Sequence, residues 1–302
     1  MPGSRFLWPR ASLRVVNGEI QPRLGQPGAP MGLSRIYLLV HGFNNDRYQA
    51  EESYKAFRRR IQSAIPLHLL ERVWQFYWPG YEDLVPEIFR SRFKAARVLS
   101  VGLNALLYSK QISKAEKFGE LLGHYLLSLR ARTGVTEIVL IGHSLGCRLI
   151  LEAARAMLNT GTVVRHQIPA MCLMAAAIPA EHVQFGGRLY QAAGFAANRI
   201  VLYSRNDTVL KYAFPLGQTL AADCRMPEAI GLSGNPRLRW TALDETMLTH
   251  GEYWSEPVTT PHILRLFGQA TRVDLPGLPI LVRRLAENTS LPERLLPQHD
   301  LA

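Results

Sequence analysis

One serine in this chain lies where a predicted strand turns into a predicted helix. Ser144 is the centre of Gly142-His143-Ser144-Leu145-Gly146, which matches G-x-S-x-G. A β-branched apolar run at 135–141 precedes it, and apolar residues recur at helical spacing over 145–158. In such a strand–turn–helix the hydroxyl projects from the carboxyl end of the strand, and the flanking glycines remove Cβ clashes. A G-x-S-x-G run also arises by chance, but these flanking elements favour a nucleophilic serine.

A serine hydroxyl becomes a good nucleophile when a base removes its proton and an acid orients the base. Asp207 follows a predicted strand at 199–203, and His250 follows another at 236–243. Singly, a loop aspartate is usually a turn former and one of nine histidines is incidental. Together with Ser144 they predict a Ser–His–Asp triad, because all three lie on loops after strands.

Three other residues are reserve candidates for the acid and the base. Asp244 and Glu245 could replace the acid, and His262 could replace the base. His262 is the weaker base candidate because it falls inside a predicted helix at 257–269.

A second loop could stabilise the oxyanion formed when a serine attacks a carbonyl. A predicted strand at 35–40 runs into His41-Gly42-Phe43-Asn44-Asn45. Two amides are needed, and we assign them to Phe43 and to Leu145, the residue after the serine. Gly42 would give the backbone room, with His41 and His143 as supporting residues. The alternative is an ordinary glycine turn after a strand.

The order of predicted elements indicates the fold class and the domain boundaries. Strands alternate with helices, which predicts an α/β fold with a mostly parallel twisted sheet and helices on both faces. The 302 residues are 47% hydrophobic, enough for a sizeable core. We expect an N-terminal arm with a hairpin at Asn17-Gly18 over 1–30, one α/β domain over 31–270 and an extension over 271–302.

The segment 81–112 mixes basic and apolar residues and has two interpretations. It could be a helix pair packed on the core, followed by a separate helix at 114–132. It could instead be a cap over the site, or a basic surface that touches an anionic membrane through Arg90, Arg92, Lys94 and Arg97.

Net charge and apolar runs limit the partners. The net charge is +11, but the arginines that dominate it are scattered and no recognition motif accompanies them, so we expect no nucleic-acid partner. Residues 1–10 lack an apolar leader and no run reaches the length of a membrane span. The expected location is cytoplasmic, with peripheral membrane contact as a candidate; the oligomeric state is left open.

Cysteine and glycine spacing give no sign of a metal or a nucleotide cofactor. No two of the three cysteines, Cys147, Cys172 and Cys224, have C-x-x-C spacing. The simplest interpretation is that they are small, buried hydrophobic residues of a protein in a reducing compartment. Motifs of the types H-E-x-x-H, G-x-x-x-x-G-K-[ST] and G-x-G-x-x-G do not occur. We therefore expect neither metal nor cofactor.

Over residues 35–269 the chain resembles the α/β-hydrolase superfamily, and within it a group of serine hydrolases of uncertain physiological role. The resemblance depends on the loop 41–45, the elbow 142–146, and the runs 206–210 and 249–251. It implies cofactor-free hydrolysis of a small-molecule ester, thioester or amide through an acyl-enzyme. The link between strands at 170–177 and 199–203 is short, so any lid would come from 81–112. The alternatives are an acyltransferase that uses the same triad, or an inactive binding protein that docks on an anionic surface.

Overall fold

The computed structural model describes residues 12–23, 34–43, 47–80, 96–161, 168–234, 240–244 and 248–268. The chain forms two units, 1–270 and 271–302, and every described residue belongs to the first. Several predictions concern residues outside these ranges: Asn44, Asn45, Arg90, Arg92, Lys94, Glu245 and the extension at 271–302. Arg97 lies in a helix, but its side chain is not among those described.

An eight-stranded sheet forms the centre of the first unit, in the order β2-β1-β4-β3-β5-β6-β7-β8. The strands are β1 (Ser12–Val16), β2 (Glu19–Arg23), β3 (Arg35–Val40), β4 (Val73–Tyr77), β5 (Glu137–His143), β6 (Ala170–Met174), β7 (Asn198–Tyr203) and β8 (Thr241–Asp244). Only β2 is antiparallel to its neighbour; the pairings from β1 to β8 are parallel. This mostly parallel sheet confirms the predicted α/β-hydrolase fold class.

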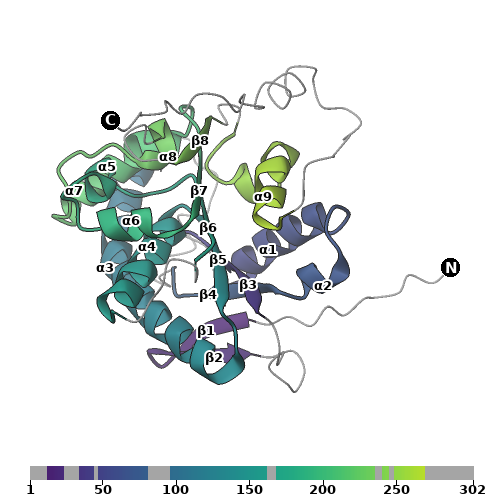
Figure 1. Ribbon diagram of the computed structural model, residues 1–302. Helices are drawn as coiled ribbons and strands as arrows, with labels where there is room; N and C mark the ends of the chain where they lie inside the picture. Colours follow the sequence, from purple (N-terminus) through teal and green to yellow (C-terminus); the bar gives the residue numbers. More distant parts are fainter. Residues whose placement is uncertain are drawn as a thin grey trace, which may run out of the picture. The chain divides into compact units, whose positions relative to one another are not determined.

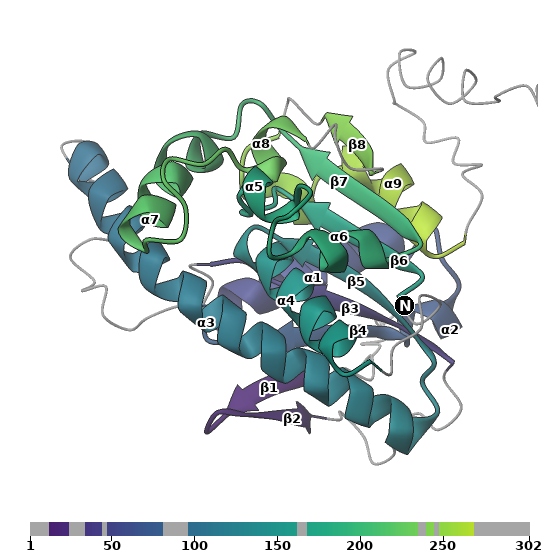
Figure 2. The same cartoon turned by 60° about the vertical axis from the view of Figure 1, so that its left-hand side comes forward.

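Helices cover both faces of the sheet (Figures 1 and 2). On one face lie α1 and α9, and on the other α4 with α3 outside it, and α6. The α-helices are α1 (Arg47–Ile61), α2 (Leu67–Leu70), α3 (Ala96–Thr133), α4 (Leu145–Asn159), α5 (Ala180–Val183), α6 (Tyr190–Phe195), α7 (Phe214–Leu220), α8 (Ile230–Ser233) and α9 (Thr260–Leu266). Shorter turns are η3 (Val209–Ala213), η4 (Glu252–Trp254) and η5 (Pro257–Thr259). Because both faces are covered, the central strands β3, β4 and β5 are almost wholly buried and apolar.

The first hairpin has the turn that its sequence favours. Asn17 and Gly18 connect β1 to β2 with φ of 51° and 81°, values that a two-residue hairpin turn requires and that these residue types tolerate. β1 then pairs in parallel with β4, so the hairpin extends the main sheet and β2 forms its edge.

One predicted helix boundary was wrong. The helix expected at 114–132 is the second half of α3, which begins at Ala96 and is continuous through 112. No proline interrupts this stretch, and its long contacts with α4 and α7 stabilise the helix despite its glycines. The link between β6 and β7 contains two short helices: α5 ends where Gln184 adopts an extended conformation, and α6 begins at Tyr190.

α3 is also the longest helix described. Among the described residues, no helix is both long and apolar enough to cross a membrane, and α3 is no exception.

α3 and α4 approach each other through two glycines one turn apart. A Cβ added to Gly119 would lie 2.5 Å from Glu152 Cβ, and one added to Gly123 would lie 2.5 Å from the Ala153 carbonyl oxygen. The obstacle is backbone or Cβ on the partner helix, which cannot rotate away. The spacing of α3 from the helix that carries Ser144 therefore depends on the absence of side chains here.

Gly123→Ala should destabilise the protein by about 1 to 3 kcal/mol, because overpacking outweighs the better helix propensity of alanine. The matched control is Gly194→Ala in α6, where the nearest atom to an added Cβ is 3.7 Å away. That control should be neutral or more stable by up to about 1 kcal/mol. Urea unfolding of both variants measures the difference, and equal midpoints would contradict the close approach.

Candidate active site

Ser144 occupies the turn between β5 and α4 with a strained backbone. Its φ is 53° and its ψ is −126°, a conformation rare for residues with a side chain. Hydrogen bonds hold it on both sides: the Ser144 N–H donates to the Met174 carbonyl at 2.9 Å, and its carbonyl accepts from the amides of Cys147 at 3.0 Å and Ala177 at 3.2 Å. The serine is therefore fixed by β6 and by the first turn of its own helix.

Three glycines make room for this turn. A Cβ on Gly142 would lie 2.6 Å from Ile150 Cδ1, and one on Gly146 would overlap the carbonyl oxygen of His41. A Cβ on Gly42 would lie 2.7 Å from the Cβ of Ser144. A side chain at any of these three glycines would therefore collide with a specific neighbouring atom.

The structure brings together the three residues that the sequence analysis selected for the triad. His250 Nε2 lies 2.8 Å from Ser144 Oγ, and His250 Nδ1 lies 2.7 Å from Asp207 Oδ2. Asp207 follows β7 and is fully buried, whereas the His250 side chain, on the loop after β8, is 19% exposed. With Asp207 accepting from Nδ1–H, Nε2 is free to accept the serine proton.

The carboxylate of Asp207 has further donors that fix its direction. Its Oδ1 accepts hydrogen bonds from the amides of Val209 and Leu210, both at 3.0 Å. These amides belong to η3, the turn that follows the aspartate. Two amides on one oxygen and a histidine on the other satisfy a buried carboxylate and hold it toward His250.

One reserve residue, His262, can be compared with the site. It lies within α9, as expected, and does not line the cavity beside Ser144. The backbone of Asp244 ends β8, where it pairs in register with Tyr203; its side chain is not among those described.

His143, the residue before the serine, holds the loop that carries His250. His143 Nε2 donates to the carbonyl oxygen of His250 at 2.6 Å, and the two imidazole centroids are 5.1 Å apart. Burial lowers the pKa of His143 to about 3, with the neighbouring His250 as a second cause, so the ring is neutral near pH 7. The sequence analysis gave His143 only a supporting role; this contact spans 107 positions, so local spacing could not reveal it.

His41 fixes the peptide that carries one of the proposed oxyanion donors. Its Nε2 accepts from the Trp78 amide at 3.4 Å, so its Nδ1–H donates to the Gly42 carbonyl oxygen at 2.9 Å. Burial lowers the pKa of His41 to about 4, which keeps this tautomer neutral. The Gly42 carbonyl and the Phe43 N–H belong to one planar peptide, so fixing the first fixes the direction of the second.

Tyr54 and Trp78 anchor the same loop and were not identified from the sequence. The Tyr54 hydroxyl accepts from the His41 N–H at 2.8 Å and lies 2.8 Å from the carbonyl oxygen of Phe76. Trp78 Nε1–H donates to the His41 carbonyl at 2.9 Å, and its ring stacks on the imidazole. An aromatic residue in a predicted helix or strand carries no local signal of such a role.

A cavity of about 310 Å³ opens beside Ser144 and His250. Apart from the polar groups already described and Ser53, its walls are apolar or aromatic. They include Phe43, Tyr108, Ala177, Val209, Leu210, Ala213, Phe214 and Trp254. Phe43 and Tyr108 meet edge to face, with ring centroids 5.8 Å apart, so α3 and the loop after β3 form one wall. No charged side chain lines this cavity among the described residues.

Comparisons with known proteins give one family match and several distant structures. A family model described as a protein of unknown function (DUF726) matches residues 99–225. No curated protein matches the chain. A predicted CIB-like hydrolase from Thermoplasma acidophilum is 13% identical, with a TM-score of 0.40, over 86% of this chain and 97% of that chain.

Two further solved structures have similar values. The lin2722 gene product of Listeria innocua is 9% identical, with a TM-score of 0.43, over 80% of this chain and 96% of that chain. A thermophilic esterase from Thermogutta terrifontis is 15% identical, with a TM-score of 0.36, over 78% and 90% respectively. The fold of this chain is established by its own strand order, its helices on both faces and the turn at Ser144: it is an α/β-hydrolase fold.

Proposed function

We propose that the protein is a cofactor-independent serine hydrolase that cleaves a carboxylic ester, thioester or amide through an acyl-enzyme. The observation that carries the proposal is the position of His250 between Ser144 Oγ, at 2.8 Å, and Asp207, at 2.7 Å. Hydrogen-bonded side chains in this order are what nucleophilic activation of a serine needs.

In the proposed acylation step, Ser144 Oγ forms a bond to the substrate carbonyl carbon while His250 Nε2 takes the hydroxyl proton. The negative charge that develops on the carbonyl oxygen is held by the amides of Phe43 and Leu145. When the tetrahedral intermediate collapses, the bond to the leaving group breaks and His250 donates its proton to that group. Water then repeats the sequence on the acyl-enzyme, and Ser144 recovers its proton.

Two neutral histidines support this assignment because they position backbone groups on which it depends. His41 holds the peptide between Gly42 and Phe43, and His143 holds the backbone of His250. Because burial depresses both pKa values, neither competes with His250 for the proton near pH 7. His250 is therefore our assignment for the general base.

The cavity favours an uncharged, apolar acyl group. Its walls bury apolar surface and, in the part described, offer no charge to pair with an acidic or basic substituent. Activated esters with aliphatic acyl chains are therefore suitable first substrates.

Ser144→Ala should abolish labelling by a fluorophosphonate probe and lower turnover of activated esters by about 10⁴-fold or more, because the nucleophile is lost. Ser255→Ala, at an exposed serine outside the cavity, is the matched control and should keep both signals. Persistent labelling of Ser144→Ala would rule out Ser144 as the nucleophile. Product analysis with added alcohols or amines separates hydrolysis from acyl transfer.

Asp207→Asn should lower kcat by about 10⁴-fold while leaving the fold intact. The asparagine Oδ1 can still accept the amides of Val209 and Leu210, which turns its NH₂ group toward His250 Nδ1. Nδ1 must then accept, so the imidazole proton moves to Nε2, where it blocks removal of the Ser144 proton. Steady-state kinetics with a circular dichroism check measure this; a loss below tenfold would contradict the role of Asp207.

The free energy of unfolding should fall as the pH falls from about 6.5 toward 4. His41 and His143 have folded-state pKa values lowered to about 4 and about 3, so the unfolded chain binds their protons first. Within that window each contributes about 1.4 kcal/mol of lost stability per pH unit. Urea unfolding at successive pH values tests this, with His124→Gln, at an exposed histidine, as a control that keeps the slope. A flat profile from 6.5 to 4.5 would rule it out.

A further inference from the structure

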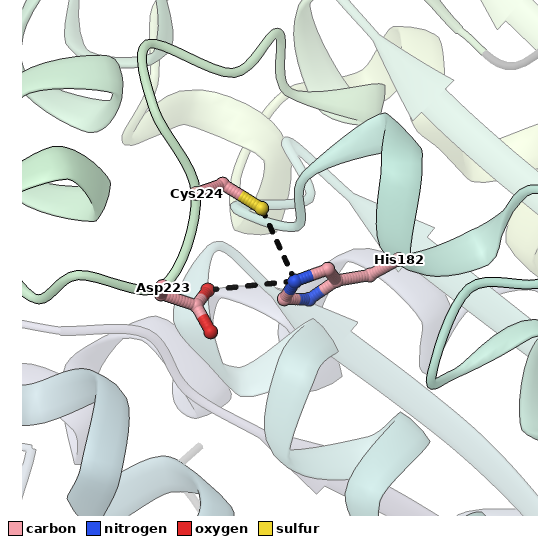
Figure 3. A group of neighbouring side chains, drawn as sticks. All are labelled: His182, Asp223 and Cys224. Carbon is pink, nitrogen blue, oxygen red and sulfur yellow. Dashed lines mark hydrogen bonds and ion pairs between the residues drawn. The ribbon is translucent and has the colours of Figure 1, made fainter.

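A second cluster of reactive side chains lies outside the cavity, between α5 and the loop that follows α7 (Figure 3). His182 comes from α5, and Asp223 and Cys224 are adjacent in the loop. His182 Nε2 lies 3.2 Å from Cys224 Sγ and 3.7 Å from an oxygen of Asp223. All three ligand atoms lie within 4.8 Å of one another.

The shared nitrogen distinguishes this cluster from a nucleophilic relay. In a Cys–His–Asp relay the thiol and the carboxylate contact opposite nitrogens of the ring. Here both face Nε2, while Nδ1 is buried without a hydrogen-bond partner in the described part of the chain. Burial and the carboxylates of Asp223 and Glu181 also raise the pKa of Cys224 to about 11, so the metal-free thiol is protonated and a poor nucleophile.

We propose that His182, Asp223 and Cys224 form a binding site for a divalent transition metal of the zinc class. Imidazole nitrogen, carboxylate oxygen and thiolate sulfur are the ligand types that Zn²⁺ takes in tetrahedral sites. In such a site bonds of about 2.0 to 2.3 Å separate neighbouring ligand atoms by roughly 3.3 to 3.7 Å. The Nε2–Sγ and Nε2–Oδ2 separations, 3.2 and 3.7 Å, are close to that geometry without rearrangement of the backbone.

Metal binding requires a neutral imidazole, a carboxylate and a thiolate from these three residues. Arg148 donates to both oxygens of Asp223, which favours the carboxylate form. The Cys224 thiol releases its proton to solvent as the sulfur–metal bond forms.

A fourth ligand position has a candidate beside it. The carboxylate of Glu181, next to His182 in α5, has Oε2 at 4.0 Å from Cys224 Sγ. It is near enough to complete the coordination or to accept a hydrogen bond from a bound water.

The surrounding charges leave room for a dication. In the described residues three guanidinium groups pair here with three carboxylates: Arg148, Arg155 and Arg188 with Glu116, Glu152 and Asp223. Glu181 adds a fourth negative charge, and ionised Cys224 would add a fifth. The cluster then has a net charge of −2, which a divalent ion neutralises. Arg148 occupies both oxygens of Asp223, but each carboxylate oxygen has a second lone pair for the metal.

The site would add a link between two segments that already meet through the hydrogen bond from the Ala180 N–H to the Glu228 carbonyl, 2.9 Å long. α5 follows β6, whereas Asp223 and Cys224 follow α7, whose residue Phe214 lines the cavity. A metal that bridges them would hold the end of α7 against α5. This inference involves no step of the proposed hydrolysis and does not depend on it.

The test is titration of the untagged, reduced, metal-free protein with Co²⁺, followed by absorbance. Cobalt replaces zinc in such sites, and a bound thiolate gives a ligand-to-metal charge-transfer band. We expect one Co²⁺ per chain with that band, and its loss when Zn²⁺ is added. Cys147 and Cys172 are fully buried elsewhere, so the band can be attributed to Cys224.

Cys224→Ser should lose the band, and His182→Gln should bind Co²⁺ about tenfold more weakly or worse, since even outer partners of a metal site contribute that much. His124→Gln, at an exposed histidine, should behave like the wild type. Circular dichroism confirms that each variant is folded. Absence of the band in the wild type at millimolar Co²⁺, or its persistence in Cys224→Ser, would overturn the proposal.

Discussion

The strained backbone of Ser144 is the constraint on which the site depends. A non-glycine residue at positive φ costs about 1 to 3 kcal/mol, and it persists only where its surroundings define it fully. Here hydrogen bonds from β6 and α4 fix the peptides on both sides of the serine. The glycines at 42, 142 and 146 then let the loop after β3, the end of β5 and the start of α4 approach within van der Waals distance of one another. The turn places the Ser144 side chain at the wall of the cavity.

Parallel pairing of β3 with β5 explains why two neutral histidines support the site. The register places Val40 beside Gly142, so His41 and His143 occupy the next step at the carboxyl ends of neighbouring strands. Each is buried, and each donates one ring N–H to a backbone carbonyl, of Gly42 and of His250 respectively. Protonation would leave a buried charge, so desolvation lowers both pKa values and keeps each ring neutral.

The sequence allowed prediction of the parts that depend on local chemistry. A strand, a glycine-flanked serine and a helix are contiguous, and Asp207 and His250 follow strands that a parallel sheet brings to one edge. It did not allow prediction of contacts that packing creates. His143 contacts His250, which is 107 positions away in the sequence. The helix α3 is continuous because it packs on α7 near Tyr108 and on α4 near Gly119 and Gly123. Likewise, His182 and Cys224 have no motif spacing, since only the fold places them together.

Arg148 links α4, the helix that follows Ser144, to α3 and to the loop after α7. It lies one turn beyond Ser144 in α4, is fully buried, and pairs with Glu116 of α3 and with Asp223 after α7. A buried ion pair gains little net stability over apolar packing, because desolvation offsets the attraction. Its geometry is nevertheless demanding: a guanidinium with two carboxylates is satisfied only when α3, α4 and the loop after α7 are all in place. The network therefore specifies where α4 lies more than it stabilises the fold, and the position of α4 determines where Ser144 Oγ points.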